Sequence, residues 1–104
     1  MRYVVDIDGT ICTSTKSDYE NAEPYLDRIA QINQLYDLGH VIIYCTARGM
    51  GHTPFVDQAD HWWGELTKNQ LDEWGCKYHR LIMGKPAGDL YIDDKAVTDG
   101  AFFG

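Results

Sequence analysis

Two carboxylates, Asp6 and Asp8, follow the apolar run at residues 3–5, and their type and spacing suit chemistry. A buried carboxylate loses hydration unless it is paired with a cation or holds a metal. If the strand geometry breaks just after Asp6, one carboxylate and one backbone carbonyl face a single cation. Gly9 permits a tight reversal there, and Thr10 offers a hydroxyl and a backbone N–H to an anion. The pattern indicates a carboxylate nucleophile, a second carboxylate for proton transfer and a hard cation between them.

Hydrophobic periodicity predicts the elements that position these residues. Uninterrupted apolar runs indicate buried strands, and apolar residues at helical spacing indicate amphipathic helices. We expect strands over 2–6, 41–45, 78–83 and 90–92, and helices over about 24–38 and 57–74. The predicted core faces of the two helices are Tyr25, Ile29, Ile32 and Tyr36, and Trp63, Leu66, Gln70 and Trp74. The polar residues 7–23 are predicted to form an ordered flap, and the glycine-rich residues 47–56 a second loop.

The order of the elements predicts an α/β fold. We expect a three-layer Rossmann-like parallel sheet with helices on both faces and right-handed crossovers. In such sheets, ligands bind beyond the carboxyl ends of the strands. Asp6, Thr46 and the pair Asp93-Asp94 all lie at such ends in the predicted order. Three separate segments are therefore expected to converge on one site.

The composition restricts the classes of protein to which the chain can belong. Its 104 residues suit a single domain, 1–104. The formal net charge of −7 argues against nonspecific binding to nucleic acid or anionic membranes, which requires clustered Lys and Arg. Three cysteines without metal-type spacing, and no secretory leader, predict reduced thiols and a cytoplasmic location. No apolar stretch reaches the roughly 20 residues of a membrane span.

Taken together, the candidate residues form an ordered series of four motifs. They are Asp6-Ile7-Asp8-Gly9-Thr10, Thr46 at a strand end, Lys85, and Asp93-Asp94. In this order they resemble the haloacid dehalogenase (HAD) superfamily, and the resemblance covers nearly the whole chain. The segments Val-Asp-Ile-Asp-Gly-Thr-Ile-Cys and Tyr-Ile-Asp-Asp-Lys-Ala are more narrowly similar to small bacterial HAD phosphatases found with capsule or surface-polysaccharide biosynthesis.

The resemblance implies a role for each motif. Asp6 would attack phosphorus to form an aspartyl-phosphate, and Asp8 would protonate the leaving oxygen and then deprotonate the attacking water. Thr46 would donate a hydrogen bond to a phosphoryl oxygen, and Lys85 would neutralise Asp6 and the phosphate. An acid at the Asp8 position is typical of phosphatases and phosphomutases, whereas transport ATPases carry Thr there and dehalogenases lack the acid. The resemblance therefore favours phosphoryl chemistry over carbon–halogen chemistry.

A magnesium ion is the implied cofactor. Its ligands would be Asp6, the backbone carbonyl of Asp8 and the last motif, in which we favour Asp94 as the direct ligand and Asp93 as the residue that orients it. Two like unit charges at about 4 Å repel by roughly 4 kcal/mol at an effective dielectric constant near 20. Mg²⁺ and Lys85 would therefore decide whether a phosphate dianion binds among four carboxylates.

Four residues are predicted to contact the substrate, namely Gly9, Thr10, Ala47 and Arg48. Backbone N–H groups near Asp8 and Ala47 would complete the anion site. Two interpretations stand for Arg48: a contact with the leaving group of the substrate, or a surface or structural salt bridge. No stretch is long enough for the cap domain that many HAD enzymes insert. We therefore expect a minimal, capless fold with an open site, which a large substrate or a second subunit of a homo-oligomer covers.

The predicted function is the hydrolysis of phosphomonoesters by a Mg²⁺-dependent, cytoplasmic phosphatase of the HAD type. Its substrate would be a small phosphorylated metabolite, and the resemblance alone favours a sugar phosphate of polysaccharide precursor synthesis. One alternative is a nucleotide or polynucleotide-end phosphatase, which the acidic balance disfavours. The other is a non-catalytic phosphate-binding or regulatory module, against which the presence of both Asp6 and Asp8 argues.

Overall fold

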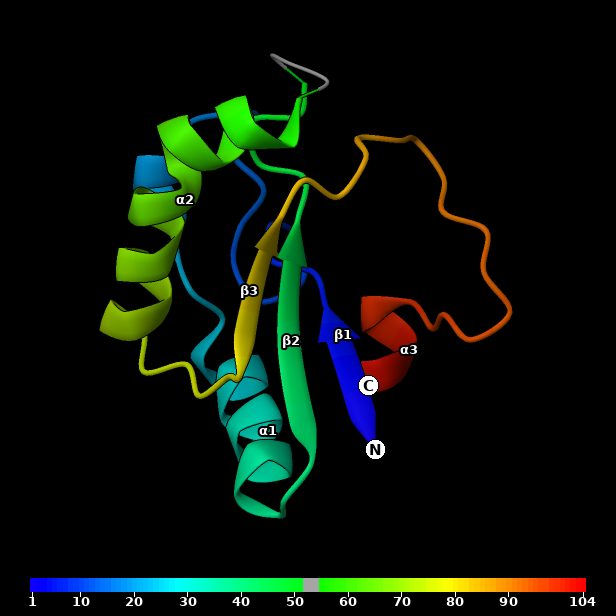
Figure 1. Ribbon diagram of the computed structural model, residues 1–104. Coiled ribbons are helices and arrows are strands. Elements are labelled where there is room, and N and C mark those ends of the chain that lie inside the picture. The colour runs from blue at the N-terminus through cyan, green and yellow to red at the C-terminus, as the bar shows by residue number, and fades with distance from the viewer. Residues whose placement is uncertain (52–54) are drawn as a thin grey trace.

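A parallel three-stranded sheet lies at the centre of the computed structural model, which describes residues 1–51 and 55–104 (Figure 1). The strands are β1 (Arg2–Val5), β2 (Val41–Thr46) and β3 (Arg80–Met83), in the spatial order β1-β2-β3. Tyr3 pairs with Ile42 in the first ladder, and Tyr44 pairs with Leu81 in the second. Because both ladders are parallel, the carboxyl ends of all three strands lie at the same end of the sheet.

Two long helices connect the strands, and each is followed by a glycine in the left-handed region. α1 (Leu26–Asp37) joins β1 to β2, and α2 (Val56–Glu73) joins β2 to β3. Gly39 has a φ of +93° and Gly75 a φ of +75°, a conformation that glycine adopts without steric cost. Two shorter elements complete the fold. They are a 3₁₀ turn, η1 (Tyr19–Asn21), which precedes α1, and a short helix, α3 (Asp99–Phe103), which follows β3 in the chain. No helix in the described part of the chain is long and apolar enough to cross a membrane.

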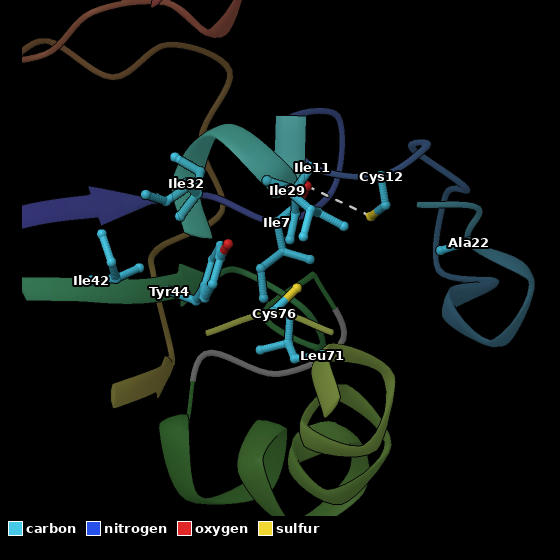
Figure 2. Close-up of a cluster of buried hydrophobic side chains, with 11 residues drawn as sticks. Ile7, Ile11, Cys12, Ala22, Ile29, Ile32, Ile42, Tyr44, Leu71 and Cys76 are labelled. Atoms are coloured by element: carbon cyan, nitrogen blue, oxygen red, sulfur yellow. Dashed lines mark hydrogen bonds between the residues drawn. The ribbon is translucent and has the colours of Figure 1, made fainter. Parts of the chain in front are cut away.

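The hydrophobic core lies between the sheet and the two long helices (Figure 2). It brings together Ile42 and Tyr44 of β2, Ile29 and Ile32 of α1, and Leu71 of α2. Ile7 and Ile11, in the turn that follows β1, are fully buried in the same cluster. The turn that carries Asp6 and Asp8 is therefore anchored in the core rather than displayed on a surface loop.

The α/β class and the Rossmann-like parallel sheet are confirmed, but the layers differ from the prediction of helices on both faces. α1 and α2 both pack on the face that carries Tyr3, Ile42 and Tyr44. The strands follow one another in a single direction across the sheet, so two right-handed crossovers place both helices on the same face. Val4 points to the opposite face and is 66% exposed. The described residues thus form two of the three predicted layers.

The predicted elements agree with the structure as far as β3, and their ends differ by at most two residues. The strand predicted at 90–92 is not formed: Leu90 and Ile92 are exposed, and residues 84–98 leave the sheet as irregular chain (Figure 1). Tyr91 turns back on its own segment, where its hydroxyl donates to the Pro86 carbonyl at 2.6 Å. Of the loop predicted at 47–56, residues 52–54 lie outside the described part of the chain.

Candidate active site

Residues from all three strand ends meet around Asp6. Asp6 directly follows β1, Thr46 is the last residue of β2, and Lys85 lies two residues beyond β3. The backbone N–H groups of Gly84 and Lys85 donate to the Thr46 carbonyl at 3.1 and 3.0 Å. This pair of bonds fixes the start of the chain beyond β3 against β2. The Lys85 ammonium consequently lies 3.5 Å from Oδ1 of Asp6.

Asp6 carries a charge that its surroundings only partly compensate. Burial raises the pKa of Asp6 above its ordinary value of 3.8, whereas the Lys85 ammonium and the Thr10 hydroxyl act in the opposite direction. The Thr10 hydroxyl donates to Oδ2 of Asp6 at 3.2 Å. Removal from water makes a carboxylate more basic and more nucleophilic, while a nearby cation keeps it ionised. Asp6 therefore combines both properties that a carboxylate nucleophile needs.

Asp8 forms a bidentate salt bridge with Arg48. Nε of Arg48 donates to Oδ2 of Asp8, and Nη2 donates to Oδ1, both at 2.9 Å. The Arg48 side chain is 0% exposed and the Asp8 side chain 21% exposed. A bidentate guanidinium–carboxylate pair fixes the plane of the carboxylate as well as its charge. Asp8 is thus held rigidly, with part of its surface open to solvent.

Polar residues of α2 hold the other side of the Arg48 guanidinium. Nη1 donates to the Thr67 hydroxyl at 3.2 Å and to the Gln70 side-chain oxygen at 2.5 Å. The ring of Tyr19 lies 4.9 Å from the guanidinium carbon. Four of the five guanidinium N–H groups can therefore find protein acceptors in an otherwise apolar setting. Arg48 links the first motif to α2.

This arrangement bears on the two interpretations of Arg48. The salt bridge exists, and it is buried rather than on the surface. The predicted contact between Arg48 and the leaving group of a substrate stays a prediction. Sequence reasoning did not single out Tyr19, Thr67 or the polar role of Gln70. The signal was present, since Thr67 and Gln70 are polar residues three positions apart within the buried face of α2.

The turn after Asp8 uses most of its own hydrogen-bonding groups. Gly9 has a φ of +80° and its N–H donates to the Cys12 carbonyl, while the N–H of Thr10 donates to the Ile7 carbonyl. The N–H groups of Gly9 and Thr10 are therefore engaged, and their predicted contacts with the substrate stay predictions. The Cys12 thiol lies 3.6 Å from both the Ile7 carbonyl (Figure 2) and Oδ1 of Asp8. Burial, and then the charge of Asp8, raises the pKa of Cys12 to about 12, which keeps the thiol protonated.

Thr46 and Ala47 occupy different positions relative to solvent. Thr46 is buried, and its hydroxyl accepts a hydrogen bond from the Arg48 N–H at 3.1 Å. Its predicted hydrogen bond to a phosphoryl oxygen remains a prediction. Ala47 lines a cavity of about 260 Å³ that Asp8 also borders. Ala47 therefore lies on the accessible side of the site.

Asp93 and Asp94 are not brought to the carboxylates of the first motif. Both are exposed, and Asp93 accepts a hydrogen bond from the Lys95 N–H at 2.8 Å, which lowers the pKa of Asp93. Within the described residues, no three His, Cys, Asp or Glu side chains form a group that could hold a metal ion. The four predicted oxygen donors are thus split into two pairs, and this arrangement does not complete the predicted Mg²⁺ site. The segment contacts the site through Tyr91, whose ring lies 4.1 Å from the Lys85 ammonium.

Comparisons with known proteins place the fold. No protein-family model matches the chain, and no curated protein matches it. A crystal structure from Vibrio cholerae, described only as a target protein, shares 33% identity and a TM-score of 0.89 over 98% of this chain and 86% of that one. The D,D-heptose 1.7-bisphosphate phosphatase from B. bronchiseptica, complexed with magnesium and phosphate, gives a TM-score of 0.56 at 15% identity. That match covers 91% of this chain and 53% of the phosphatase, and it shows a shared fold.

Proposed function

We propose that this chain, which belongs to the same family as the Vibrio cholerae protein, is a HAD-type phosphatase that hydrolyses phosphomonoesters. The observation that carries the proposal is the pairing of Asp6 with Lys85 at 3.5 Å, beside an Asp8 that Arg48 holds with two hydrogen bonds. One carboxylate next to an ammonium suits attack on a phosphoryl group. The second, immobilised and partly open, suits proton transfer.

The proposed reaction has two steps. An oxygen of Asp6 attacks phosphorus, the bond from phosphorus to the ester oxygen breaks, and Asp8 gives its proton to the departing alcohol. A water molecule then attacks the aspartyl-phosphate, Asp8 takes a proton from that water, and Asp6 is released with inorganic phosphate. Lys85 offsets negative charge on Asp6 and the phosphoryl oxygens in both steps.

Arg48 sets the orientation of Asp8 in this scheme. A carboxylate has about four lone-pair positions, of which Arg48 uses two. The remaining positions can receive a proton or bind a water molecule on the side where Asp8 is exposed. Arg48 therefore acts through Asp8 as a positioning residue.

Magnesium remains part of the proposal as a resident cofactor. When bound, it would supply positive charge for the phosphoryl oxygens. Asp6 and the Asp8 carbonyl are the proposed ligands from the first motif, with Asp94 and Asp93 from the second. Among the described residues, Asp93 and Asp94 do not group with the carboxylates of the first motif, so the described arrangement does not complete this ligand set.

A sugar phosphate is the proposed class of substrate. The fold is shared with a phosphatase whose name specifies a heptose bisphosphate, and the first and last motifs of the chain resemble small phosphatases of polysaccharide biosynthesis. The net charge of −7 disfavours a polynucleotide end as the substrate. Cytoplasmic location and assembly into a homo-oligomer stay predictions of the sequence.

Hydrolysis of p-nitrophenyl phosphate tests the proposal. The assay compares the wild type with Asp6→Asn, in Mg²⁺ and after removal of metal by EDTA. We expect Mg²⁺-dependent release of p-nitrophenol that falls at least about 1,000-fold in Asp6→Asn, because an amide cannot form the phospho-intermediate. Asp37→Asn is the matched control, since Asp37 is an exposed residue of α1 that, within the described part of the chain, forms its salt bridge with Lys77.

Two outcomes would contradict the proposal. Full activity in Asp6→Asn would remove the nucleophile from its assigned role. Binding of inorganic phosphate without turnover of p-nitrophenyl phosphate or of a panel of sugar phosphates would instead support the non-catalytic module.

A further inference from the structure

A cavity lies against Asp8. Its volume is about 260 Å³, and its walls include Ser14, Thr15, Lys16 and Tyr19 from the flap, and Ala87 from the segment after β3. Pockets that hold drug-sized ligands usually measure about 300–1,000 Å³. This cavity therefore suits a group the size of a single sugar ring.

The position of the cavity assigns it to one part of the substrate. In the proposed reaction, Asp8 gives its proton to the alcohol that leaves phosphorus. The ester oxygen must then lie within hydrogen-bonding reach of Asp8. Asp8 borders the cavity, so the group attached to that oxygen extends into it.

Four of the residues that line the cavity carry a hydroxyl group. Ser14, Thr15, Ser17 and Tyr19 each contribute one, and Lys16 adds an ammonium. The Tyr19 hydroxyl accepts a hydrogen bond from the Gly49 N–H at 3.1 Å, which leaves its own proton to donate. Groups that both donate and accept, in a small space, match a ligand that itself carries several hydroxyl groups.

Thr15 supplies an independent sign that a ligand belongs here. Its Oγ1 is buried, and it has no hydrogen-bond partner among the residues that the structure describes. An unsatisfied buried hydroxyl is costly, and buried polar groups are ordinarily paired. Rotation about χ1 moves a threonine hydroxyl between staggered positions, so a ligand in the cavity can provide the missing partner.

The flap that forms these walls is already fixed in place. The Gln70 side-chain amide donates to the Tyr19 carbonyl at 2.6 Å, and the Tyr19 and Trp63 rings make an edge contact with centroids 6.0 Å apart. Lys16 and Ser17 hold positive φ values of 52° and 81°, which non-glycine residues keep only where the surroundings impose them. The cavity is therefore a preformed feature of the fold.

A second cavity, of about 250 Å³, suits a phosphate ester less well. It is lined by Gly9, Tyr25, Asp27, Arg28 and Asp99. Arg28 is paired with Asp99 at 2.8 Å, so the charge of Asp27 is left uncompensated among these residues. An anionic substrate would be repelled there.

We propose that the cavity formed by Asp8, the flap residues 14–19 and Ala87 binds the leaving alcohol of the substrate, and that this alcohol is polyhydroxylated. The assignment rests on the proposed phosphatase function. Thr15 is the residue that distinguishes a hydroxylated ring from an apolar one, because a site built to bond a substrate hydroxyl discriminates strongly against an analogue that lacks it.

A matched pair of substrates tests this assignment. One is a hexose 6-phosphate, taken as the best of a panel, and the other is cyclohexylmethyl phosphate, a primary ester with a ring of similar size and no hydroxyls. The quantity measured is the ratio of the two kcat/KM values. We expect a ratio well above one in the wild type, and a fall of about tenfold in Thr15→Val, which keeps the shape of the side chain but loses the hydroxyl.

Two further variants separate this effect from damage to the flap. Thr15→Ser restores a hydroxyl and should bring the ratio back to within about twofold of the wild type. Thr13→Val removes a hydroxyl that accepts from the Glu23 N–H at the base of the flap, away from the cavity lining. We expect its ratio to equal that of the wild type even if the amount of folded enzyme falls, because a ratio does not depend on enzyme concentration.

The outcomes separate the two proposals. A wild-type ratio near one across the panel, or an unchanged ratio in Thr15→Val, would overturn the subsite while Asp6-dependent hydrolysis of p-nitrophenyl phosphate left the phosphatase assignment standing. Absence of any Asp6-dependent hydrolysis would overturn both.

Discussion

The two acidic pairs of this chain, Asp6 with Asp8 and Asp93 with Asp94, lie in very different surroundings. The first pair is bonded by residues from separate elements, with Lys85 beyond β3 near one carboxylate and Arg48 beyond β2 on the other. Asp93 accepts a hydrogen bond from the backbone N–H of Lys95, only two residues along the chain, and both members of the second pair are exposed. A carboxylate acquires a fixed position when distant parts of the chain converge on it, and only such a carboxylate can have its reactivity set by the fold.

An isoleucine-to-alanine substitution can be made in the core cluster that anchors the first pair and again beside the second pair. The two costs in stability measure the difference between these regions most directly. Ile32 of α1 is 1% exposed and Ile92 is 92% exposed. We expect Ile32→Ala to lower the free energy of unfolding by about 2–5 kcal/mol, because it leaves a cavity in the core. Ile92→Ala should cost less than about 0.5 kcal/mol. Urea unfolding monitors both, and a cost above about 1 kcal/mol for Ile92→Ala would mean that residues 90–92 pack as the predicted fourth strand.

Loss of the Arg48 side chain should lower the stability of the fold, because Arg48 holds Asp8 of the first acidic pair. Arg48→Met leaves Asp8 without its partner inside the fold, and we expect a loss of about 3 kcal/mol in the free energy of unfolding. That figure is at the lower end for buried pairs because Asp8 is partly solvated. Lys68→Met is the matched control, since Lys68 forms an exposed pair with Asp72 on the same helix that braces Arg48. Its stability should be indistinguishable from that of the wild type. Equal stability for Arg48→Met would show that the network with Thr67 and Gln70 contributes nothing.

The second acidic pair should affect metal affinity without affecting stability. We expect Asp94→Asn to raise the Mg²⁺ concentration for half-maximal activity by about tenfold or more, and Asp93→Asn to raise it less. The urea midpoint of both variants should match that of the wild type, because both side chains are exposed. Titration of activity with Mg²⁺ provides the measurement. If neither variant changes the titration, the segment after β3 takes no part in the site.

The smallest effect is expected at the junction of α1 and α3. Arg28 donates to Asp99 at 2.8 Å and lowers the pKa of Asp99 below 3.8. The native state therefore binds this proton more weakly than the unfolded state, so the contribution is complete above the unfolded pKa and is lost as pH falls through the native pKa. Asp99→Asn should lower stability by less than about 1 kcal/mol near neutral pH, since both side chains are partly exposed. Thermal unfolding of both proteins across the acid range should show their difference vanishing at low pH.

Much of the fold was predictable because its strands and helices are regular and obey local rules. The apolar runs at residues 3–5 and 41–45 are unbroken, and Gly39 and Gly75 mark the helix ends. The run at residues 90–92 has the same apolar character but forms no strand. Hydrophobic periodicity indicates that a segment can form a β-strand. It does not indicate whether the fold offers that segment a sheet edge with which to pair.

The candidate site was predictable in its residue types more than in its contacts. Asp6 and Lys85 lie close together, as the resemblance implied, and the parallel sheet provides the physical reason because it brings the strand ends to one edge. The salt bridge between Arg48 and Asp8 depends on the distance between α2 and the loop after β2. That distance is a tertiary property, which the spacing of residues along the chain does not encode. The hydrogen bond from Arg48 to Gln70 was not predicted for the same reason, although two polar residues on the buried face of α2, Thr67 and Gln70, gave a signal for it.

The fixed position of Tyr19 affects the rate at which a substrate can bind. A loop that must close over its ligand loses conformational freedom at each encounter, at a cost of about 0.5–1.5 kcal/mol for every side chain that becomes immobilised. Here the bonds from Gln70 and Gly49 order the flap when the protein folds. Association should then proceed without a gating step, at a rate limited by diffusion and orientation. An enzyme built in this way would spend its turnover time on chemistry and on the escape of phosphate rather than on opening and closing.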